Sequence, residues 1–165
     1  MKLGIISDTH DHLIRARAAA AAFKERGIVS IIHCGDYEAP FVLFPFRDEK
    51  FTDCFGVYGN NDGEKLMLRT VFKSIGRIEK APAFTEIAGR RFAVLHEPMP
   101  DDVMAAMPVD VVAFGHTHEV VIRPGKQTGG PLVLNPGECC GYLSNRATIA
   151  VLDTDTLDVE VIDLK

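Results

Sequence analysis

Two histidines in the motif "GHTH", His116 and His118, directly follow the apolar run 109–114. Side chains at positions i and i+2 of an extended chain lie on the same face, so we expect both imidazoles to project from one side of a strand end. Gly115 is expected to let the backbone bend sharply there. Imidazole is a common metal ligand, but two histidines do not complete a metal site, so partners from elsewhere in the chain are needed.

Residues of similar chemistry follow four further segments that are typical of strands. They are Asp8 and His10 in "SDTH", Asp36 in "CGDYE", Asn60, Asn61 and Asp62 in "GNND", and His96 in "FAVLHE". In parallel α/β sheets, ligands bind at the carboxyl ends of the strands. We therefore expect these residues and the "GHTH" histidines to meet at one sheet edge.

Each residue taken alone has an ordinary structural explanation. Asp8 could cap the following helix. Asp36 and the segment 59–62 could be turn residues, and His96 could be a structural histidine. These independent explanations do not account for a whole set of potential metal ligands on one edge.

Seven of these residues form a chemically sensible ligand set, with two carboxylates, one amide oxygen and four imidazoles. That number suits two ions that share a bridging carboxylate. Nitrogen and oxygen ligands without thiolate suit Mn²⁺, Fe, Co²⁺, Ni²⁺ or Zn²⁺ rather than Ca²⁺ alone, and we take Mn²⁺ as the first candidate. A pair of divalent ions about 3.5–4 Å apart can hold the attacking and leaving oxygens of an in-line displacement. The chemistry therefore indicates metal-assisted hydrolysis of a phosphate ester.

The elements expected to carry these residues alternate in the first half of the chain. Strands are predicted over 2–7, 28–34 and 52–59, and helices over 11–27 (with Asp11 as N-cap and Gly27 as stop), 39–50 (disturbed by proline) and 64–76. This β-α-β-α-β-α order predicts a parallel sheet with covering helices.

The second half has a different pattern. It predicts two strands within 83–97 joined by an Ala-Gly turn, a short helix over 100–108, a strand over 109–115, a strand-turn-strand unit over 119–137 and a hairpin over 147–165. No linker or repeat separates the halves, so we expect one α/β domain over residues 1–165 with two packed sheets.

The composition is that of an ordinary globular protein, with 165 residues, 47% apolar residues, 25% charged residues and a net charge of −5. No Lys/Arg-rich block predicts specific nucleic-acid binding. No signal peptide or membrane span is evident, so a cytoplasmic location is expected. The four cysteines (34, 54, 139 and 140) form no CxxC pair and are expected to be reduced thiols. A homodimer is expected only because such dimers are common.

The motifs resemble those of the calcineurin-like metallophosphoesterase superfamily, whose pattern is D-x-H, G-D, G-N-x-D/E, a lone histidine and G-H-x-H. Here they occupy residues 8–10, 35–36, 59–62, His96 and 115–118, in that order. The short chain and the later "NPGE" resemble the small YfcE-type phosphodiesterases. The resemblance implies a four-layer α-β-β-α sandwich with two mixed sheets, acting on a small phosphodiester.

The resemblance also implies a role for each ligand. Asp8, His10 and His118 would hold the first metal, Asp36 would bridge, and Asn60, His96 and His116 would hold the second. A metal-bridging hydroxide would then be the nucleophile.

Some positions depart from the family pattern or lie outside it. Asn61 stands where many members have a histidine, and an amide cannot act as a general acid, so poor leaving groups should react slowly. Asp62 is expected to orient the loop of Asn60 rather than bind metal. Arg146 could contact a substrate phosphate or form a surface ion pair.

Two glutamates stand where other residues are usual, Glu97 in place of glycine and Glu138 in place of serine. Each could add negative charge near the mouth of the site, and so favour a monoanionic diester over a dianionic monoester, or point into solvent. The alternative to an enzyme is a non-catalytic protein-interaction scaffold on the same fold, against which the seven intact ligands argue.

Overall fold

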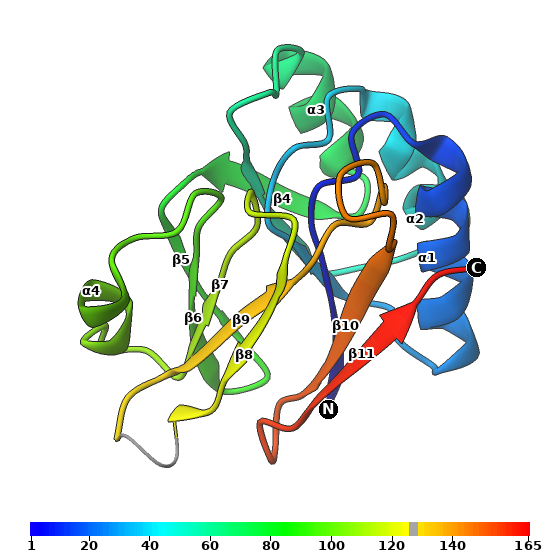
Figure 1. Ribbon diagram of the computed structural model, residues 1–165. Coiled ribbons are helices and arrows are strands. Elements are labelled where there is room, and N and C mark those ends of the chain that lie inside the picture. The colour runs from blue at the N-terminus through cyan, green and yellow to red at the C-terminus, as the bar shows by residue number, and fades with distance from the viewer. Residues whose placement is uncertain (126–128) are drawn as a thin grey trace.

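The computed structural model describes residues 1–125 and 129–165, which form two β-sheets packed face to face with helices on both sides (Figure 1). The first sheet has the strand order β11-β10-β1-β2-β3-β4. Strands β1 to β4 are parallel, whereas β10 is antiparallel to both β1 and β11. Its strands are β1 (Lys2–Ile6), β2 (Ile31–His33), β3 (Cys54–Tyr58), β4 (Gly76–Lys80), β10 (Thr148–Asp153) and β11 (Val159–Asp163).

The second sheet has the order β5-β6-β7-β9-β8. Its three central strands are parallel, and both edge strands pair antiparallel with their neighbours. The strands are β5 (Ala83–Ile87), β6 (Arg90–Val94), β7 (Val111–Ala113), β8 (Val120–Arg123) and β9 (Leu132–Pro136). Both sheets are therefore mixed, as predicted.

Three helices and a 3₁₀ turn cover the outer face of the first sheet, and one short helix lies on the other side of the molecule (Figure 1). They are α1 (Leu13–Glu25), the 3₁₀ turn η1 (Pro40–Leu43), α2 (Phe44–Asp48) and α3 (Lys65–Phe72) on one side, and α4 (Asp101–Ala105) on the other. The observed four layers confirm the predicted sandwich.

Three apolar clusters join these layers. Phe23 and Phe46 pack within the layer between the helices and the first sheet. Phe55 and Phe92 meet between the two sheets, and Met104 of α4 belongs to a third cluster on the outer face of the second sheet. A fully buried side chain of this size contributes about 1.5–3 kcal/mol, so each interface has its own source of stability.

Two local predictions were wrong. The first helix begins at Leu13 with His12 at its N-cap position, and Asp11 has a left-handed φ of 54° with its N–H donated to the carbonyl of Tyr37. The strand β4 was missed because its sequence, GRIEK, buries only Ile78 and so lacks the apolar pattern of a central strand. It lies at the sheet edge, where such a sequence is tolerated.

The other element predictions are close to the structure. The proline-disturbed helix is observed as η1 followed by α2, and the Ala88–Gly89 turn has the two positive φ angles of a tight hairpin. Part of the turn predicted between β8 and β9, residues 126–128, lies outside the described residues. No helix of the described chain is long and apolar enough to cross a membrane.

Candidate metal centre

The predicted ligands lie in the loops that follow five strands, and these strands belong to two sheets rather than one. Loops after β1, β2 and β3 come from the first sheet, and loops after β6 and β7 come from the second. Backbone contacts join them. The His116 N–H donates to both carboxylate oxygens of Asp8, at 3.2 and 3.1 Å, and the Gly115 N–H donates to the carbonyl of His96 at 3.0 Å. The site therefore spans the gap between the sheets.

The backbone of these loops is not extended. Strand β7 ends at Ala113, and a left-handed φ occurs at five of the seven predicted ligands: Asp8, His10, Asp36, His116 and His118. The two "GHTH" histidines therefore do not project from one face of a strand, as was predicted. Each such residue costs about 1 kcal/mol or more, and such strain accumulates where function requires it.

Two glycines explain how the loops approach one another. A Cβ on Gly115 would lie 1.9 Å from Ser7 Oγ, and a Cβ on Gly59 would lie 2.1 Å from Asp36 Oδ1. The chain bends at the two residues after Gly115, but Gly115 itself does not have a positive φ, so close approach rather than backbone conformation requires this glycine.

The first cluster consists of Asp8, His10 and His118. His118 Nε2 lies 3.6 Å from Asp8 Oδ1, and His10 Nε2 lies 3.8 Å from the same oxygen. The two imidazole rings stack with centroids 5.1 Å apart. His10 Nε2 is buried and has no hydrogen-bond partner among the described residues. An unsatisfied buried nitrogen facing carboxylate oxygens is what a cation site requires.

The second cluster consists of Asn60, His96 and His116. Asn60 Oδ1 lies 2.8 Å from His96 Nε2 and 3.0 Å from His116 Nδ1. The rings of the two histidines are nearly perpendicular, with centroids 5.1 Å apart. The side-chain atoms that could bind an ion thus converge from three different loops.

Asp36 lies between the two clusters, with one carboxylate oxygen facing each. Its Oδ2 is 3.7 Å from His10 Nε2, and its Oδ1 is 3.4 Å from His96 Nε2. Burial would raise the pKa of Asp36, but its contacts with His96 and Asn61 outweigh burial and hold its pKa below the usual value. An ionised carboxylate with its oxygens turned to two ligand clusters has the geometry of a bridge.

The donor set fits divalent ions. Two ligand atoms that each lie about 2.1 Å from one ion are roughly 3–3.5 Å apart. The candidate ligand atoms within each cluster, and those of Asp36 and its neighbouring histidines, have separations close to this. Burial raises the pKa of Asp8, and a cation bound beside this carboxylate would favour its ionised form. Nitrogen and oxygen donors of this kind suit Mn²⁺, Fe, Co²⁺, Ni²⁺ or Zn²⁺.

Three of the four candidate histidine ligands are oriented through Nδ1 by groups that were not predicted to contact them. His10 Nδ1 lies 2.8 Å from Glu38 Oε1, and His118 Nδ1 lies 2.7 Å from Glu138 Oε2. His96 Nδ1 lies 2.8 Å from the carbonyl oxygen of Cys34, which can only accept, so this nitrogen carries the proton. In each case Nε2 is left to face a cluster. Glu38 carries no sequence signal beyond its place in the loop after Asp36.

Glu138 is fully buried, so neither expectation for it, charge at the mouth or exposure to solvent, was correct. Besides His118, its carboxylate accepts hydrogen bonds from the backbone N–H groups of residues 142–144, the Ser144 hydroxyl and the Cys140 thiol. Burial would raise the pKa of Glu138, but these bonds, led by Ser144 and His118, lower its pKa to about 2. The carboxylate therefore stays ionised and ties the loop after β9 to the first cluster.

Asp62 is also buried, and it connects the loops after β2 and β3. Its carboxylate accepts the N–H groups of Asp36, Tyr37 and Glu38 and that of Gly59, at 2.7–3.2 Å. Asp62 thereby ties the loop that carries Asn60 to the loop that carries Asp36.

Asn61 contacts the bridging carboxylate. Its Nδ2 donates to Asp36 Oδ2 at 2.7 Å and its backbone N–H donates to Oδ1 at 3.0 Å. The residue is exposed, so it lies at the open side of the site.

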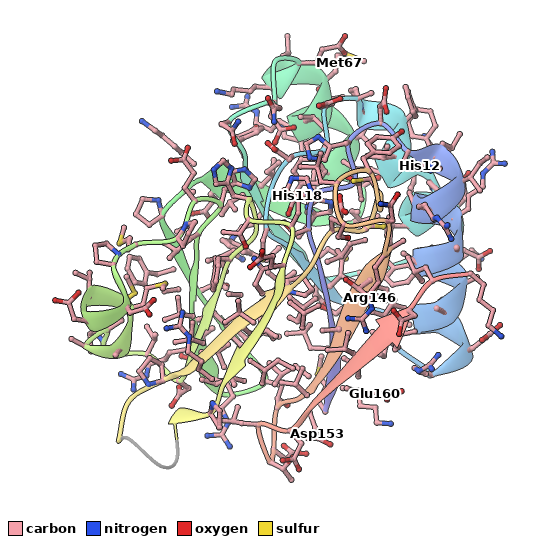
Figure 2. All side chains as sticks on the ribbon, in the orientation of Figure 1. His12, Met67, His118, Arg146, Asp153 and Glu160 are labelled. Carbon is pink, nitrogen blue, oxygen red and sulfur yellow. The ribbon has the colours of Figure 1, made fainter. Side chains whose placement is uncertain are left out.

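The structure does not bring Arg146 to the clusters. Its guanidinium pairs with the carboxylate of Asp163 at the end of β11, whereas His118 lies near the upper ends of the strands (Figure 2). The ion-pair alternative therefore describes this arginine. Glu97 is exposed and lines a cleft that also contains Asn60 and His96.

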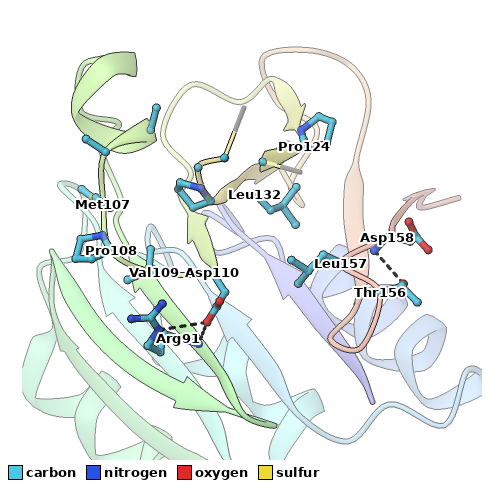
Figure 3. A pocket seen from close by; sticks show the side chains of 16 residues that line it. Arg91, Met107, Pro108, Val109, Asp110, Pro124, Leu132, Thr156, Leu157 and Asp158 are labelled. Atoms are coloured by element: carbon cyan, nitrogen blue, oxygen red, sulfur yellow. Dashed lines mark hydrogen bonds and ion pairs between the residues drawn. The ribbon is translucent and has the colours of Figure 1, made fainter. Parts of the chain in front are cut away.

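A separate cleft of about 670 Å³ lies at the amino ends of β7 and β9, opposite the ligand loops (Figure 3). Its lining includes the Arg91–Asp110 ion pair and Leu157, and none of the seven predicted ligands. It is therefore not part of the metal centre.

A two-sheet sandwich that gathers carboxylate, amide and imidazole side chains in the loops between its sheets is typical of a metallophosphoesterase. The chain belongs to the calcineurin-like phosphoesterase superfamily, whose domain matches residues 1–157. It is 38% identical to the phosphodiesterase MJ0936 of Methanocaldococcus jannaschii over the whole length of both chains. The predicted family is thus confirmed, and these findings support a metal-dependent phosphoesterase.

Solved structures agree on the fold. An archaeal phosphodiesterase superposes with a TM-score of 0.88 at 38% identity, with 99% of this chain and all of that chain covered. YfcE, a phosphoesterase from E. coli, superposes with a TM-score of 0.66 at 19% identity over the full length of both chains, and at that identity it supports the fold alone.

Proposed function

We propose that this protein hydrolyses a small phosphodiester with the help of two divalent ions, Mn²⁺ being the first candidate. The position of Asp36 carries the proposal, because its two carboxylate oxygens face two separate ligand clusters at 3.7 and 3.4 Å. Asp8, His10 and His118 would hold one ion, and Asn60, His96 and His116 the other. The likeness to a phosphodiesterase over the whole chain supports the same reaction class.

The ions, when bound, would activate water for attack on phosphorus and offset the charge of the phosphate. The chain's own residues orient the site. Glu38 and Glu138 hold the imidazoles of His10 and His118 through Nδ1, and Asp62 fixes the loop that carries Asp36. Asn61 is the exposed amide beside the bridge and would donate a hydrogen bond to a substrate oxygen.

A diester is favoured over a monoester by the charge around the first cluster. The Glu38 carboxylate, 40% exposed, lies beside His10 and adds negative charge close to the expected position of the phosphate. A monoanionic diester meets less repulsion there than a dianionic monoester does.

The test is elemental analysis of metal-reconstituted protein, combined with hydrolysis of an activated bis-aryl phosphodiester and the matching aryl monoester by the same sample. We expect about two ions per chain, turnover that disappears on chelation and returns with Mn²⁺, and a higher kcat/KM for the diester. Little bound metal and no turnover with any of the five candidate metals would favour the interaction scaffold. One ion per chain with full activity would contradict the dinuclear centre.

We also infer a cytoplasmic location. All four cysteines are free thiols in the structure, and reduced thiols persist in that compartment.

A further inference from the structure

A cleft of about 410 Å³ opens beside the second ligand cluster and lies within reach of any substrate bound there. Asn60 and His96 form part of its wall, so the cleft is continuous with the site described above. The other walls come from the ends of β3 and β4, the start of α3 and the loop after β6, including Tyr58, Lys65 and Lys80. Its volume is at the small end for ligand sites, so it suits one compact group rather than a long chain.

Two lysines from different elements converge on this cleft. Lys65 begins α3 and Lys80 ends β4, where it pairs in register with Tyr58. Among the described residues, neither lysine has a carboxylate within ion-pair distance. Glu97 also lines the cleft. The two lysines and this glutamate together give the lining of the cleft a formal charge of +1.

Tyr58 holds one of these lysines in place. Its hydroxyl donates to the carbonyl oxygen of Lys65 at 3.2 Å, and Lys65 Nζ lies 5.8 Å from the centre of the Tyr58 ring. A cation held over an aromatic face loses less conformational freedom when it later binds an anion. The half-buried ring thus presents Lys65 toward the cleft.

Negative and positive side chains lie on different sides of the candidate metal centre. The carboxylates Asp8, Glu38 and Glu138 gather at the first cluster, whereas the two lysines lie beside the second. In a chain with a net charge of −5, a cleft with positive net charge is distinctive. It attracts negative charge next to the ions, at the place where one ester arm of a bound phosphodiester would extend.

We propose that this cleft binds a second anionic group of the substrate through Lys65 and Lys80, so that the natural substrate is a phosphodiester with a phosphate or carboxylate on one of its alcohols. This inference rests on the proposed function, because it concerns the ester arm beside the reacting phosphate. It names a substrate class that the metal ligands alone do not define.

The test compares three bis-aryl phosphodiesters with similar leaving groups: one uncharged apart from the diester, one with a carboxylate on one ring and one with a phosphonate there. We expect the metal-loaded protein to prefer the charged esters in kcat/KM. We expect Lys65→Ala and Lys80→Ala each to reduce that preference about two- to five-fold, the range for partly exposed ion pairs. Lys80→Glu should invert it. A larger preference for the phosphonate than for the carboxylate identifies phosphate as the natural group, and the reverse identifies carboxylate.

Lys73→Ala is the matched control, because Lys73 is exposed at the end of α3 and does not line the cleft. It should retain the full preference. The preference should also weaken as salt is raised, since the lysines are exposed. Equal rates for charged and uncharged esters, or a preference that survives Lys80→Glu, would overturn the inference while leaving the proposed function intact. Absence of metal-dependent turnover with all three esters would instead overturn the proposed function.

Discussion

Glu138 Oε2 lies 2.7 Å from His118 Nδ1, and the same carboxylate holds the loop that follows β9. A carboxylate at this position fixes the imidazole with its proton on Nδ1 and leaves Nε2 for the first ligand cluster. Glu38 supports His10 in the same way at 2.8 Å. Both histidines of the first cluster are therefore supported by negative charge, whereas His96 of the second cluster is supported by a neutral carbonyl.

Glu138→Gln should weaken the first metal site and destabilise the fold. Each carboxylate oxygen of Glu138 accepts hydrogen bonds from at least two donors. In either orientation of a glutamine amide, its NH₂ group would therefore face donors rather than acceptors. We expect a loss of at least about 3 kcal/mol in unfolding free energy and roughly 10- to 100-fold weaker binding of one ion. Calorimetric metal titration and denaturant unfolding measure both quantities. Glu38→Gln is the comparison, because the partly exposed Glu38 should affect binding more than stability. Unchanged metal binding in Glu138→Gln would contradict the orienting role.

Gly115→Ala should disrupt the contact between the two sheets at the site. The added Cβ would lie 1.9 Å from Ser7 Oγ and 2.7 Å from Asp8 Oδ2, so one of these groups must move. Overpacking of this kind costs about 1–3 kcal/mol, and here it also displaces a predicted ligand. Gly63→Ala is a matched control, because a Cβ there has no atom within 4 Å and its φ is not positive. Thermal unfolding with and without Mn²⁺ should show a lower Tm and a smaller metal-induced rise only for Gly115→Ala. A normal metal response would show that the site tolerates the displacement.

The convergence of the candidate ligands could be predicted from the sequence, because metal chemistry restricts residue type and because parallel strands deliver their carboxyl ends to one side. Asp36 and His96 follow buried strands whose apolar runs are evident in the sequence. Two packed sheets could be expected from the change of pattern between the two halves of the chain, but the strand order within each sheet could not, since apolar runs do not specify strand partners. Local periodicity also could not show that Asp8 and His118 lie in left-handed loops, because tertiary contacts impose that conformation.

The supporting residues were beyond sequence reasoning for a different reason. Glu138 is 20 residues from the histidine it orients and Glu38 is 28 residues from His10, so no local pattern pairs them. An acidic residue in a loop is normally solvated, and only the fold shows that Glu138 is buried among donors. The edge strand β4 was missed because its exposed charges resemble those of a loop.

Arg146→Ala should leave hydrolysis unchanged. The guanidinium is exposed and engaged by Asp163, away from both ligand clusters, so its removal takes no positive charge from the phosphate site. We expect kcat/KM for the bis-aryl diester to stay within about two-fold of the original, because an exposed pair contributes little. A loss of ten-fold or more that appears in KM would show that Arg146 leaves Asp163 and binds substrate.

Asp36→Asn should remove binding at both sites together. Among the residues that the structure describes, Asp36 is the one with an oxygen toward each cluster, and the amide brings neither the negative charge nor a second good acceptor. We expect both ions to bind more weakly by more than the ~100-fold that is typical when a residue merely supports a ligand. Asp48→Asn, at the exposed end of α2, is the control and should bind both ions as tightly as the unsubstituted protein does. Elemental analysis at limiting Mn²⁺ reports the stoichiometry directly. Loss of only one ion would show that Asp36 belongs to a single site.

Asn61→His should accelerate hydrolysis of esters with poor leaving groups more than that of esters with good ones. Asn61 is exposed at the open side of the centre and donates to Asp36 Oδ2 at 2.7 Å, but its amide N–H is too weakly acidic to protonate a departing alcohol. Histidine would provide that proton near neutral pH, and we expect roughly ten-fold for an alkyl leaving group and little change for a nitrophenyl group. Loss of the bond to Asp36 would slow all substrates alike, so the two effects separate in a plot of log kcat/KM against leaving-group pKa. Asn61→Ala removes the same hydrogen bond without adding an acid. The slope of this plot for Asn61→Ala should therefore match that of the unsubstituted protein. An equal change for every leaving group in Asn61→His would exclude a missing general acid as the reason for slow turnover of poor leaving groups.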